Sequence, residues 1–467
     1  MTPWPRWLMA RLLTTRAACT ARITNPPSMT APTAIAADAT ELAAMPPHYR
    51  RNFAAGLIHG IFFQASAAFS SIHTVMPSLV AILTPAAAAV GLMATLQNVG
   101  QFIPQLYTAY LIDGRSRKKP WLVAIITIRF LALALLAWLT FQFGLTRPGL
   151  VLTAIIALFG LFSFIGGMGT VVYADIFARA IPARRRGRFS GAKQLFGYLL
   201  AILAGLVVKW ILGQPDLLPF PTNYALILAL SAGTLAVALI GFILIKEPPS
   251  PTERLLSSPR ALLPVSMRLL KHSGNLRLLL LTQSLTVLSL ALAPFFVVYA
   301  RNDLGVPLAA IGLYLSLQMV GAAGSNVLWA WLSDTHGNRS VITGTAAAAA
   351  AAAALAWLTP ATQTWLYGGV FLLLGATLSG VQVGYSNIIL EMADEVTRPM
   401  CVALRNTVLA PLAVAPLLVG LLTAWVSYPM LFMLAMLLAL GSLAASFKLR
   451  EPRNDPSARC CLPEAAL

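Results

Sequence analysis

The sequence predicts an all-α polytopic membrane protein with twelve transmembrane helices in two parallel, pseudo-symmetric six-helix bundles. Of its 467 residues, 58% are hydrophobic and only 10% are charged, whereas a soluble chain carries about 25% charged residues. The hydrophobic residues fall in long runs, and a helix needs about 20 of them to cross a bilayer. The chain also repeats itself halfway along its length. Together these three observations exclude a soluble protein.

Twelve apolar runs are the expected spans. They cover 53–76, 86–111, 120–142, 149–177, 190–212, 223–245, 276–299, 309–332, 340–358, 364–389, 401–425 and 429–447. Of the 33 basic residues, 29 fall in or beside the N-terminal segment, the C-terminal tail and the loops after every second span. Cytoplasmic loops retain Lys and Arg, so both termini are expected in the cytoplasm. The net charge of +18 therefore reflects topology, not a nucleic-acid-binding face.

An internal repeat relates the two halves. Residues 91–113 align without gaps to 312–334, with nine of 23 positions identical, where composition alone gives roughly two. Both halves end alike, in Lys246-Glu247-Pro248 and Arg450-Glu451-Pro452. We expect six-helix units over 52–247 and 275–451. Because each unit starts and ends on the cytoplasmic side, the repeats are parallel, and transporters built this way bind substrate between the repeats.

Three segments lie outside these units. Residues 1–51 form a basic cytoplasmic leader, predicted to be disordered or a misassigned start, with an organellar transit peptide as the alternative. Residues 248–274 link the halves, either as a solvated linker or with a short basic amphipathic helix at the headgroups. Residues 452–467 are predicted to form a cytoplasmic tail.

Two matching loops follow the second and eighth spans. Each has an acid at a helix end, followed by basic residues in a tight turn. Both resemble the signature loop of the major facilitator superfamily, although Ala109 and Ala330 replace its first Gly and Ser116 its second. The matching positions are Leu111, Asp113, Arg117 and Lys118 in the first half, and Leu332, Asp334, Gly337 and Arg339 in the second.

The resemblance implies two bundles that rock about a central cavity, over residues 52–451. It implies that Asp113 caps the cytoplasmic side near the start of the eleventh span, where a carboxylate beside a helix N-terminus is favoured. Glu391 and Arg398 resemble a second acid–base pair, with Asp175 as its first-half counterpart. The predicted gating residues are Asp113, Arg117, Lys118, Asp175, Asp334, Arg339, Glu391 and Arg398. The alternative for all of them is a solvated charge that only sets topology.

Polar residues inside the spans are costly in hydrocarbon unless they face a cavity or a partner. The candidates for the substrate cavity are His59, Gln97, Gln101, Gln283, Gln318, Gln382, Tyr385 and Asn406. Gln97 and Gln318 occupy equivalent repeat positions, which suits helix–helix hydrogen bonding equally well. We favour the cavity for His59 and Gln101.

Arg129 lies about 13 Å along the third span at 1.5 Å per residue. It could contact an anion, but the third helix is peripheral in the superfamily, so we expect a structural arginine with a polar neighbour. No Asp or Glu lies in the middle of a span. A proton carrier would therefore have to be His59 or His73, whose ordinary pKa of about 6.5 suits the task.

The sequence thus predicts a secondary transporter that moves a small solute by alternating access. Protons are the candidate coupling ion. The alternative is a non-transporting protein of the same fold that serves as an assembly factor or sensor. An enzyme is excluded, because the five His residues form no metal-binding spacing and no acid pair is embedded. We expect no cofactor, no metal, no nucleic acid and a monomer, whose partners are the solute and the lipid bilayer. A bacterial inner membrane is the expected location.

Overall fold

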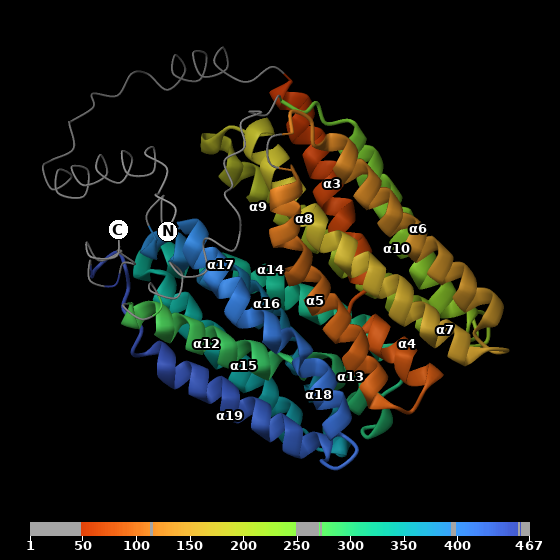
Figure 1. Ribbon diagram of the computed structural model, residues 1–467. Helices are drawn as coiled ribbons and strands as arrows, with labels where there is room; N and C mark the ends of the chain where they lie inside the picture. Colours follow the sequence, from red (N-terminus) through yellow and green to blue (C-terminus); the bar gives the residue numbers. More distant parts are fainter. Residues whose placement is uncertain are drawn as a thin grey trace, which may run out of the picture. The chain divides into compact units, whose positions relative to one another are not determined.

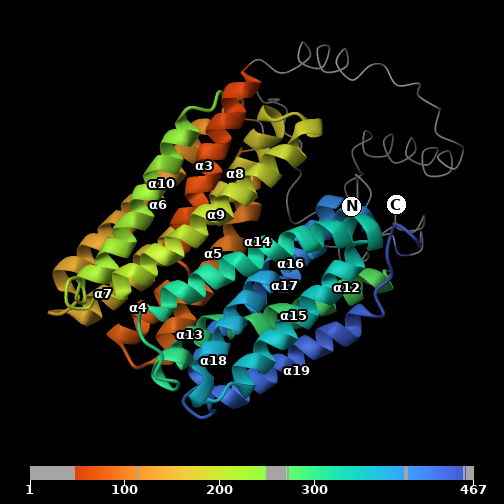
Figure 2. The same cartoon turned by 180° about the vertical axis from the view of Figure 1, so that it is seen from behind.

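The computed structural model describes residues 48–112, 115–248, 270, 273–393, 398–455 and 458. Residues 1–47 of the predicted leader and most of the predicted linker lie outside these residues, as does most of the tail beyond 455. The leader was expected to run to residue 51, but α3 already begins at Tyr49. Within the described chain, helices follow one another with short connections, as Figures 1 and 2 show from opposite sides.

The first half of the chain forms antiparallel helices. They are α3 (Tyr49–Phe69), α4 (Val75–Leu83), α5 (Ala87–Ile112), α6 (Lys119–Phe143), α7 (Pro148–Ala154), η1 (Ile155–Phe159), α8 (Gly160–Ala180), η2 (Ala183–Arg185), α9 (Arg186–Leu212) and α10 (Thr222–Ile243). Prolines stand in the first turns of α6 and α7, where the missing N–H costs nothing. We call the end at which α3, α6 and α9 begin the basic end, and the other the opposite end.

The second half repeats this pattern. Its elements are α12 (Gly274–Leu290), α13 (Ala293–Asn302), α14 (Ala310–His336), α15 (Asn338–Leu358), η3 (Ala361–Tyr367), α16 (Gly368–Met392), α17 (Arg398–Leu409), η4 (Ala410–Val414), α18 (Ala415–Leu422) and α19 (Tyr428–Ser446). As in α6 and α7, a proline stands in the first turn of α13 and of α19.

Ten of the helical segments are long and apolar enough to cross a membrane. They do not include α3 or α5, which carry His59, Gln64, Gln97 and Gln101 among their apolar residues. The twelve predicted spans coincide with helices, with one correction. The first was expected to end at residue 76, but α3 ends at Phe69, and α4 continues to Leu83 after a break.

The packing within each half joins mostly helices that are not consecutive in the chain. In the first half α3 packs on α9 and α10, α6 packs on α8 and α10, and α5 packs on α8; in the second, α16 packs on α14 and α15, and α19 packs on α12 and α15. The halves meet where α9 contacts α14 and α5 contacts α18. A core of buried Leu, Val, Ile and Phe runs through these contacts. The polar residues described next interrupt that apolar core.

Candidate functional site: a polar cavity and its charged helix ends

A polar cavity of about 210 Å³ lies where α3, α5, α6, η1 and α8 of the first half meet α14 of the second. Of the predicted residues it contains Gln97, Gln101, Gln318 and His73. Gln97 Oε1 accepts a hydrogen bond from Ser163 Oγ at 3.1 Å, while Gln318 Oε1 is buried with no partner. The cavity therefore offers a small solute several hydrogen-bonding groups. Its further polar lining is Gln64, Ser66, Ser70, Ser71 and Arg129.

Arg129 contradicts the sequence-based expectation of a structural arginine with a polar neighbour. Its side chain is 8% exposed and makes no hydrogen bond or ion pair with any described residue. Its guanidinium carbon instead lies 3.9 Å from the ring centroid of Phe162 and 5.1 Å from that of Phe63. The third span therefore contributes a residue to the cavity. Its helix, α6, packs directly on α8, and the cavity lies between these two helices and α3.

A second cavity, of about 220 Å³, adjoins the first and shares Phe63, Gln64 and Arg129 with it. It lies inside the first half, between α3, α6, α8 and α9, and its lining adds His59, Tyr173 and Lys193. The sequence analysis counted Lys193 with the basic loop before the fifth span, although it lies inside that span. Gln64 was overlooked in the same way. A search for every polar residue within a span would have found both.

The two histidines of the first span differ in their surroundings. His59 is buried, and its Nδ1 lies 2.9 Å from the carbonyl oxygen of Ala238 on α10, so this nitrogen donates the hydrogen bond. Two turns further along α3, Ser66 Oγ donates a hydrogen bond to the carbonyl of Ser231 at 2.8 Å. This face of α3 therefore joins α10 as well as lining a cavity. His73 lies in the break after α3, with its Nδ1 buried and without a partner.

The predicted cavity residues of the second half lie elsewhere. Gln283 is buried on α12 and accepts a hydrogen bond from Arg405 Nε at 2.9 Å. Tyr385 is fully buried, with its hydroxyl 3.2 Å from Thr286 Oγ1. Gln382 is exposed on α16 and Asn406 is half-buried on α17. Arg405, inside the eleventh span, was overlooked in the sequence analysis for the same reason as Lys193.

Two seams of small residues join the halves toward the opposite end. On α5, a Cβ at Gly91 would lie 2.3 Å from the carbonyl oxygen of Pro416, and Thr95 Oγ1 accepts the N–H of Leu417 at 3.1 Å. On α14, a Cβ at Gly312 would lie 2.5 Å from the carbonyl oxygen of Gly205. Because only glycine permits such an approach, these positions fix the contact.

The α14 seam repeats the α5 seam in detail. Ser316, the repeat equivalent of Thr95, donates a hydrogen bond from Oγ to the carbonyl of Ile202 at 3.0 Å. Gly312 is likewise the equivalent of Gly91. Further along α14, Asn326 Nδ2 donates a hydrogen bond to Gln194 Oε1 of α9 at 2.8 Å. The internal repeat thus supplies the same contact residues to both seams.

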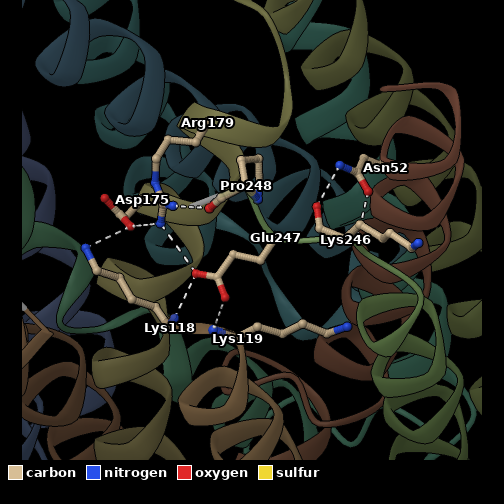
Figure 3. A network of polar contacts seen from close by, with 8 residues as sticks. All are labelled: Asn52, Lys118, Lys119, Asp175, Arg179, Lys246, Glu247 and Pro248. Carbon is tan, nitrogen blue, oxygen red and sulfur yellow. Dashed lines mark hydrogen bonds and ion pairs between the residues drawn. The ribbon is translucent and has the colours of Figure 1, made fainter. Parts of the chain in front are cut away.

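A network of charged residues lies at the basic end of the first half (Figure 3). The carboxylate of Glu247 accepts the backbone N–H of Lys118 at 2.7 Å and of Lys119 at 2.9 Å. It therefore caps the start of α6, where N–H groups lack helical partners. Asp175 pairs with Arg179 and with Lys118, whose Nζ lies 3.0 Å away. Two acids thus face two bases.

The second half has a related network with a different charge balance. Glu451, the repeat equivalent of Glu247, accepts the N–H of Arg339 at 2.8 Å at the start of α15. Glu391 pairs with Arg453, whose Nε lies 2.8 Å away. Burial raises the pKa of Glu451 above its ordinary value, and the neighbouring Glu391 carboxylate raises it further. Gly337 has φ +87°, and a Cβ there would lie 2.3 Å from Glu451 Oε2.

The remaining predicted gating residues are placed as follows. Asp113 lies outside the described residues, and so does the side chain of Arg398. Glu391 is paired with Arg453, a partner that the sequence analysis did not propose. Arg117 and Asp334 are exposed, and the Asp334 carbonyl is 3.5 Å from Arg453 Nη1. Arg339 Nη2 donates to the carbonyl of Phe447 at 2.9 Å.

Comparisons with known proteins agree with this architecture. No curated protein sequence matches the chain. Among solved structures, a mutant of the nucleoside transporter NupG is 13% identical with a TM-score of 0.66, over 86% of this chain and 100% of that one. An inward-facing bacterial homologue of the iron transporter ferroportin is 14% identical, with a TM-score of 0.64 over 85% and 98%. The xylose transporter XylE from E. coli is 13% identical, with a TM-score of 0.64 over 88% and 100%.

At these identities the structures are alike in fold alone. The family model described as Major Facilitator Superfamily, however, matches the sequence itself over residues 58–299 and 279–459. The chain therefore belongs to the major facilitator superfamily, as a multi-pass integral membrane protein and a secondary transporter of small solutes.

Proposed function

We propose that the solute binds in the cavity between the halves, against Gln97, Gln101 and Gln318, and crosses by alternating access. The observation that carries this proposal is the polar lining shared by α3, α5 and α14 in an otherwise apolar interior. Buried polar groups without partners are costly in a membrane. The unpartnered Gln318 Oε1 therefore favours a site that a ligand completes.

The two seams support a state that is closed at the opposite end. Gly91 and Gly312 bring backbones of the two halves together there. We place the basic end in the cytoplasm, since cytoplasmic loops retain Lys and Arg, with both termini on that side. In this orientation the described state faces inward. We further propose that 52–247 and 275–451 move as two units, in a monomer, in the inner membrane of a bacterium.

The charge networks fit a role in this movement. Each one joins residues of its own half: Lys118 and Asp175 in the first, Glu391 and Arg453 in the second. These contacts tie the loop between two helices to the basic end of a third. We propose that they keep each half rigid and let the exposed Arg117 and Asp334 meet the other half when the basic end closes.

Proton coupling, if the transporter uses it, is assigned to His73 in preference to His59. The His59 ring is committed to the Ala238 carbonyl and packs against Tyr173 and Phe242. The His73 Nδ1 is unpartnered beside the cavity. In proteoliposomes with an imposed pH gradient, His73→Gln should abolish gradient-driven accumulation while leaving exchange intact. Loss of accumulation in His59→Gln alone would contradict this assignment.

The experiment for the transport cycle uses a matched pair of glycines on α14. Gly312→Leu wedges the seam open, because a Cβ there already meets the backbone of α9, whereas nothing lies within 4 Å of a Cβ at Gly324. We expect Gly312→Leu to lose more than 10-fold of the solute flux in proteoliposomes and to expose the opposite end to a thiol reagent. Gly324→Leu should retain both properties. Equal flux in the two variants would refute the seam as part of the cycle.

A further inference from the structure

We propose that the transported solute is a small organic anion, whose carboxylate or phosphate group binds Arg129 with support from Lys193. This inference rests on the proposed function, since it names the class of solute and places its charged group at Arg129, where the cavity between the halves adjoins the cavity inside the first half. Its starting point is a positive charge inside the first half that none of the described residues balances.

The surroundings of Arg129 fix the position of its guanidinium group and leave its hydrogen-bond donors available for a ligand. Its guanidinium lies over the faces of Phe162 and Phe63, and its Nε is buried without a hydrogen-bond partner. On α8, Gly166 makes room for it, because a Cβ there would lie 3.0 Å from the guanidinium carbon. The planar group keeps its hydrogen-bonding edge free, and it matches a carboxylate or phosphate with two parallel N–H donors.

Lys193 brings a second cation to the same cavity from α9. Its stem lies across Gly60 of α3, where a Cβ would be 2.3 Å from Lys193 Cδ. Its Nζ lies 5.5 Å from the centre of the Tyr173 ring, and the Tyr173 hydroxyl is itself buried without a partner. His59 on α3 and Thr170 on α8 complete the polar lining. Two cations and a free hydroxyl donor therefore surround a space of about 220 Å³.

Within the part of the chain that the structure describes, no acid pairs with Arg129 or Lys193. The sequence contains no Asp or Glu between Glu41 and Asp113 or between Asp113 and Asp175. Asp175 is itself paired, with Lys118 and Arg179 at the basic end. Charged groups inside membrane proteins pair with one another or mark the path of a substrate. With pairing absent among the described residues, an anionic solute is the partner that the cavity lacks.

The cations also lie one after another in space, along a series of adjoining cavities. Arg129 belongs to both the central cavity and the cavity inside the first half. Lys193 belongs to the latter and to a third hollow of about 200 Å³, which Arg186 borders at the basic end. A cleft lined by one sign of charge concentrates ligands of the other sign. The route favours anions from the basic end to the middle of the molecule.

Arg405 provides the matched control, because it is a half-buried arginine inside a span of the second half and has a polar partner in Gln283 at 2.9 Å. If Arg129 serves the ligand, Arg129→Met removes an unbalanced charge. The unliganded variant should then melt at or above the temperature of the unmodified protein. Arg405→Met leaves Gln283 unpaired and should melt lower. A purely structural Arg129 would instead behave like Arg405 and lower the melting temperature.

The binding test uses purified protein with paired probes: benzoate and benzamide, glycerol 3-phosphate and glycerol, succinate and succinamide, with chloride and inorganic phosphate as free anions. We expect at least one organic anion to raise the melting temperature and to be taken up by proteoliposomes, and its neutral partner to do neither. Arg129→Met should weaken that binding more than 10-fold, Arg129→Lys should restore part of it, and Lys193→Gln should weaken it less. Arg147→Gln, on an exposed loop, should change nothing.

The outcomes separate this inference from the proposed function. Uptake of neutral probes that is unchanged in Arg129→Met would overturn the anion inference and leave the transporter intact. Binding of the inorganic anions alone would also overturn it, because the cavity would then hold only a counter-ion. Absence of flux for every probe, in protein that melts cooperatively, would count against the proposed function itself. If Arg129→Met fails to fold, Arg129→Lys and Lys193→Gln decide the question.

Discussion

The two halves of the molecule are built alike at their basic ends and differ in their interiors. Asn52 and Asn275 each make two hydrogen bonds to the backbone just before the Glu-Pro pair that ends their own half, to Lys246 and to Arg450, at 2.8 to 3.0 Å. Glu247 and Glu451 each cap the helix that follows the signature loop. These contacts serve the repeat, whichever solute is carried.

Inside the bundles the likeness stops. Arg129 of the first half faces a cavity and lies on aromatic rings, whereas Arg405 of the second half is hydrogen-bonded to Gln283. Both are arginines inside spans, but of the two only Arg405 has a hydrogen-bond partner among the described residues. The difference indicates that the ends preserve the fold and that the first-half interior is specialised for the ligand.

The largest difference is expected at the helix caps. Glu247→Ala leaves the N–H groups of Lys118 and Lys119 without their acceptor and removes an ion pair with Arg179 at 3.5 Å, and should cost about 2–4 kcal/mol of stability. Glu451→Ala removes one N–H bond and relieves its repulsion with Glu391, and should cost about 1 kcal/mol. Thermal unfolding in nanodiscs compares the two. Equal losses would show that the caps do not differ as described.

The second-largest loss of stability is expected when Arg405 loses its hydrogen-bond partner. Gln283→Leu leaves the Arg405 guanidinium unsatisfied and should cost about 2 kcal/mol. Gln97→Leu serves as its first-half control, because Ser163 Oγ also donates to the carbonyl of Phe159 at 2.7 Å. That variant should lose about 0.5 kcal/mol of stability. The same unfolding assay applies, and a larger loss for Gln97→Leu would contradict the comparison.

The asparagine hydrogen bonds should give smaller and less unequal effects. Asn52→Ala breaks two hydrogen bonds at a side chain that is 1% exposed, and should cost about 1–2 kcal/mol. Asn275 is half-buried, so water replaces part of what Asn275→Ala removes, and about 1 kcal/mol is expected. Proteolysis near residue 246 or 450 would report the loosened turn. A tighter turn in either variant would argue against this role of the asparagines.

The smallest effect is the pH dependence that Glu451 gives to the second half. The pKa of Glu451 is raised by burial and by Glu391, so the folded state holds its proton longer than the unfolded state, where the pKa is about 4.3. Stability should therefore fall as the pH rises from about 4.3 through the folded pKa, by about 0.5 kcal/mol after solvent screening. Glu451→Gln should remove this slope from the melting temperature. An unchanged slope would assign it elsewhere.

Much of the fold follows from hydropathy alone. Eleven of the twelve predicted spans coincide with the helical segments found, because each must bury a continuous apolar run in lipid. The exception is the first span, where the chain breaks at 70–74 and Ser70 Oγ donates a local hydrogen bond to the Ser66 carbonyl at the end of α3; the apolar run continues through this break and gives no sign of it. The superfamily itself was identified correctly from its two loops and the repeat.

The site was less accessible from the sequence. That Glu247 caps the start of α6 depends on an approach between segments that are 129 residues apart, which no local pattern encodes. The bond from His59 to a backbone carbonyl is invisible for the same reason. Lys193 and Arg405 were different, since each stood inside a predicted span and was passed over as loop charge. Arg129 was noticed, but its partner was wrongly expected to be polar.

The glycine seams have a mechanical consequence. At Gly91 and Gly312 the halves meet backbone to backbone, so no side chain at these two points has to change rotamer when the two faces part and meet again. The alternating access proposed above would therefore break and remake two contacts of equal construction, one on α5 and one on α14. A chimaera in which 91–99 and 312–320 are exchanged should keep its solute flux, whereas enlarging only one of the two glycines should hold that contact apart and reduce the flux.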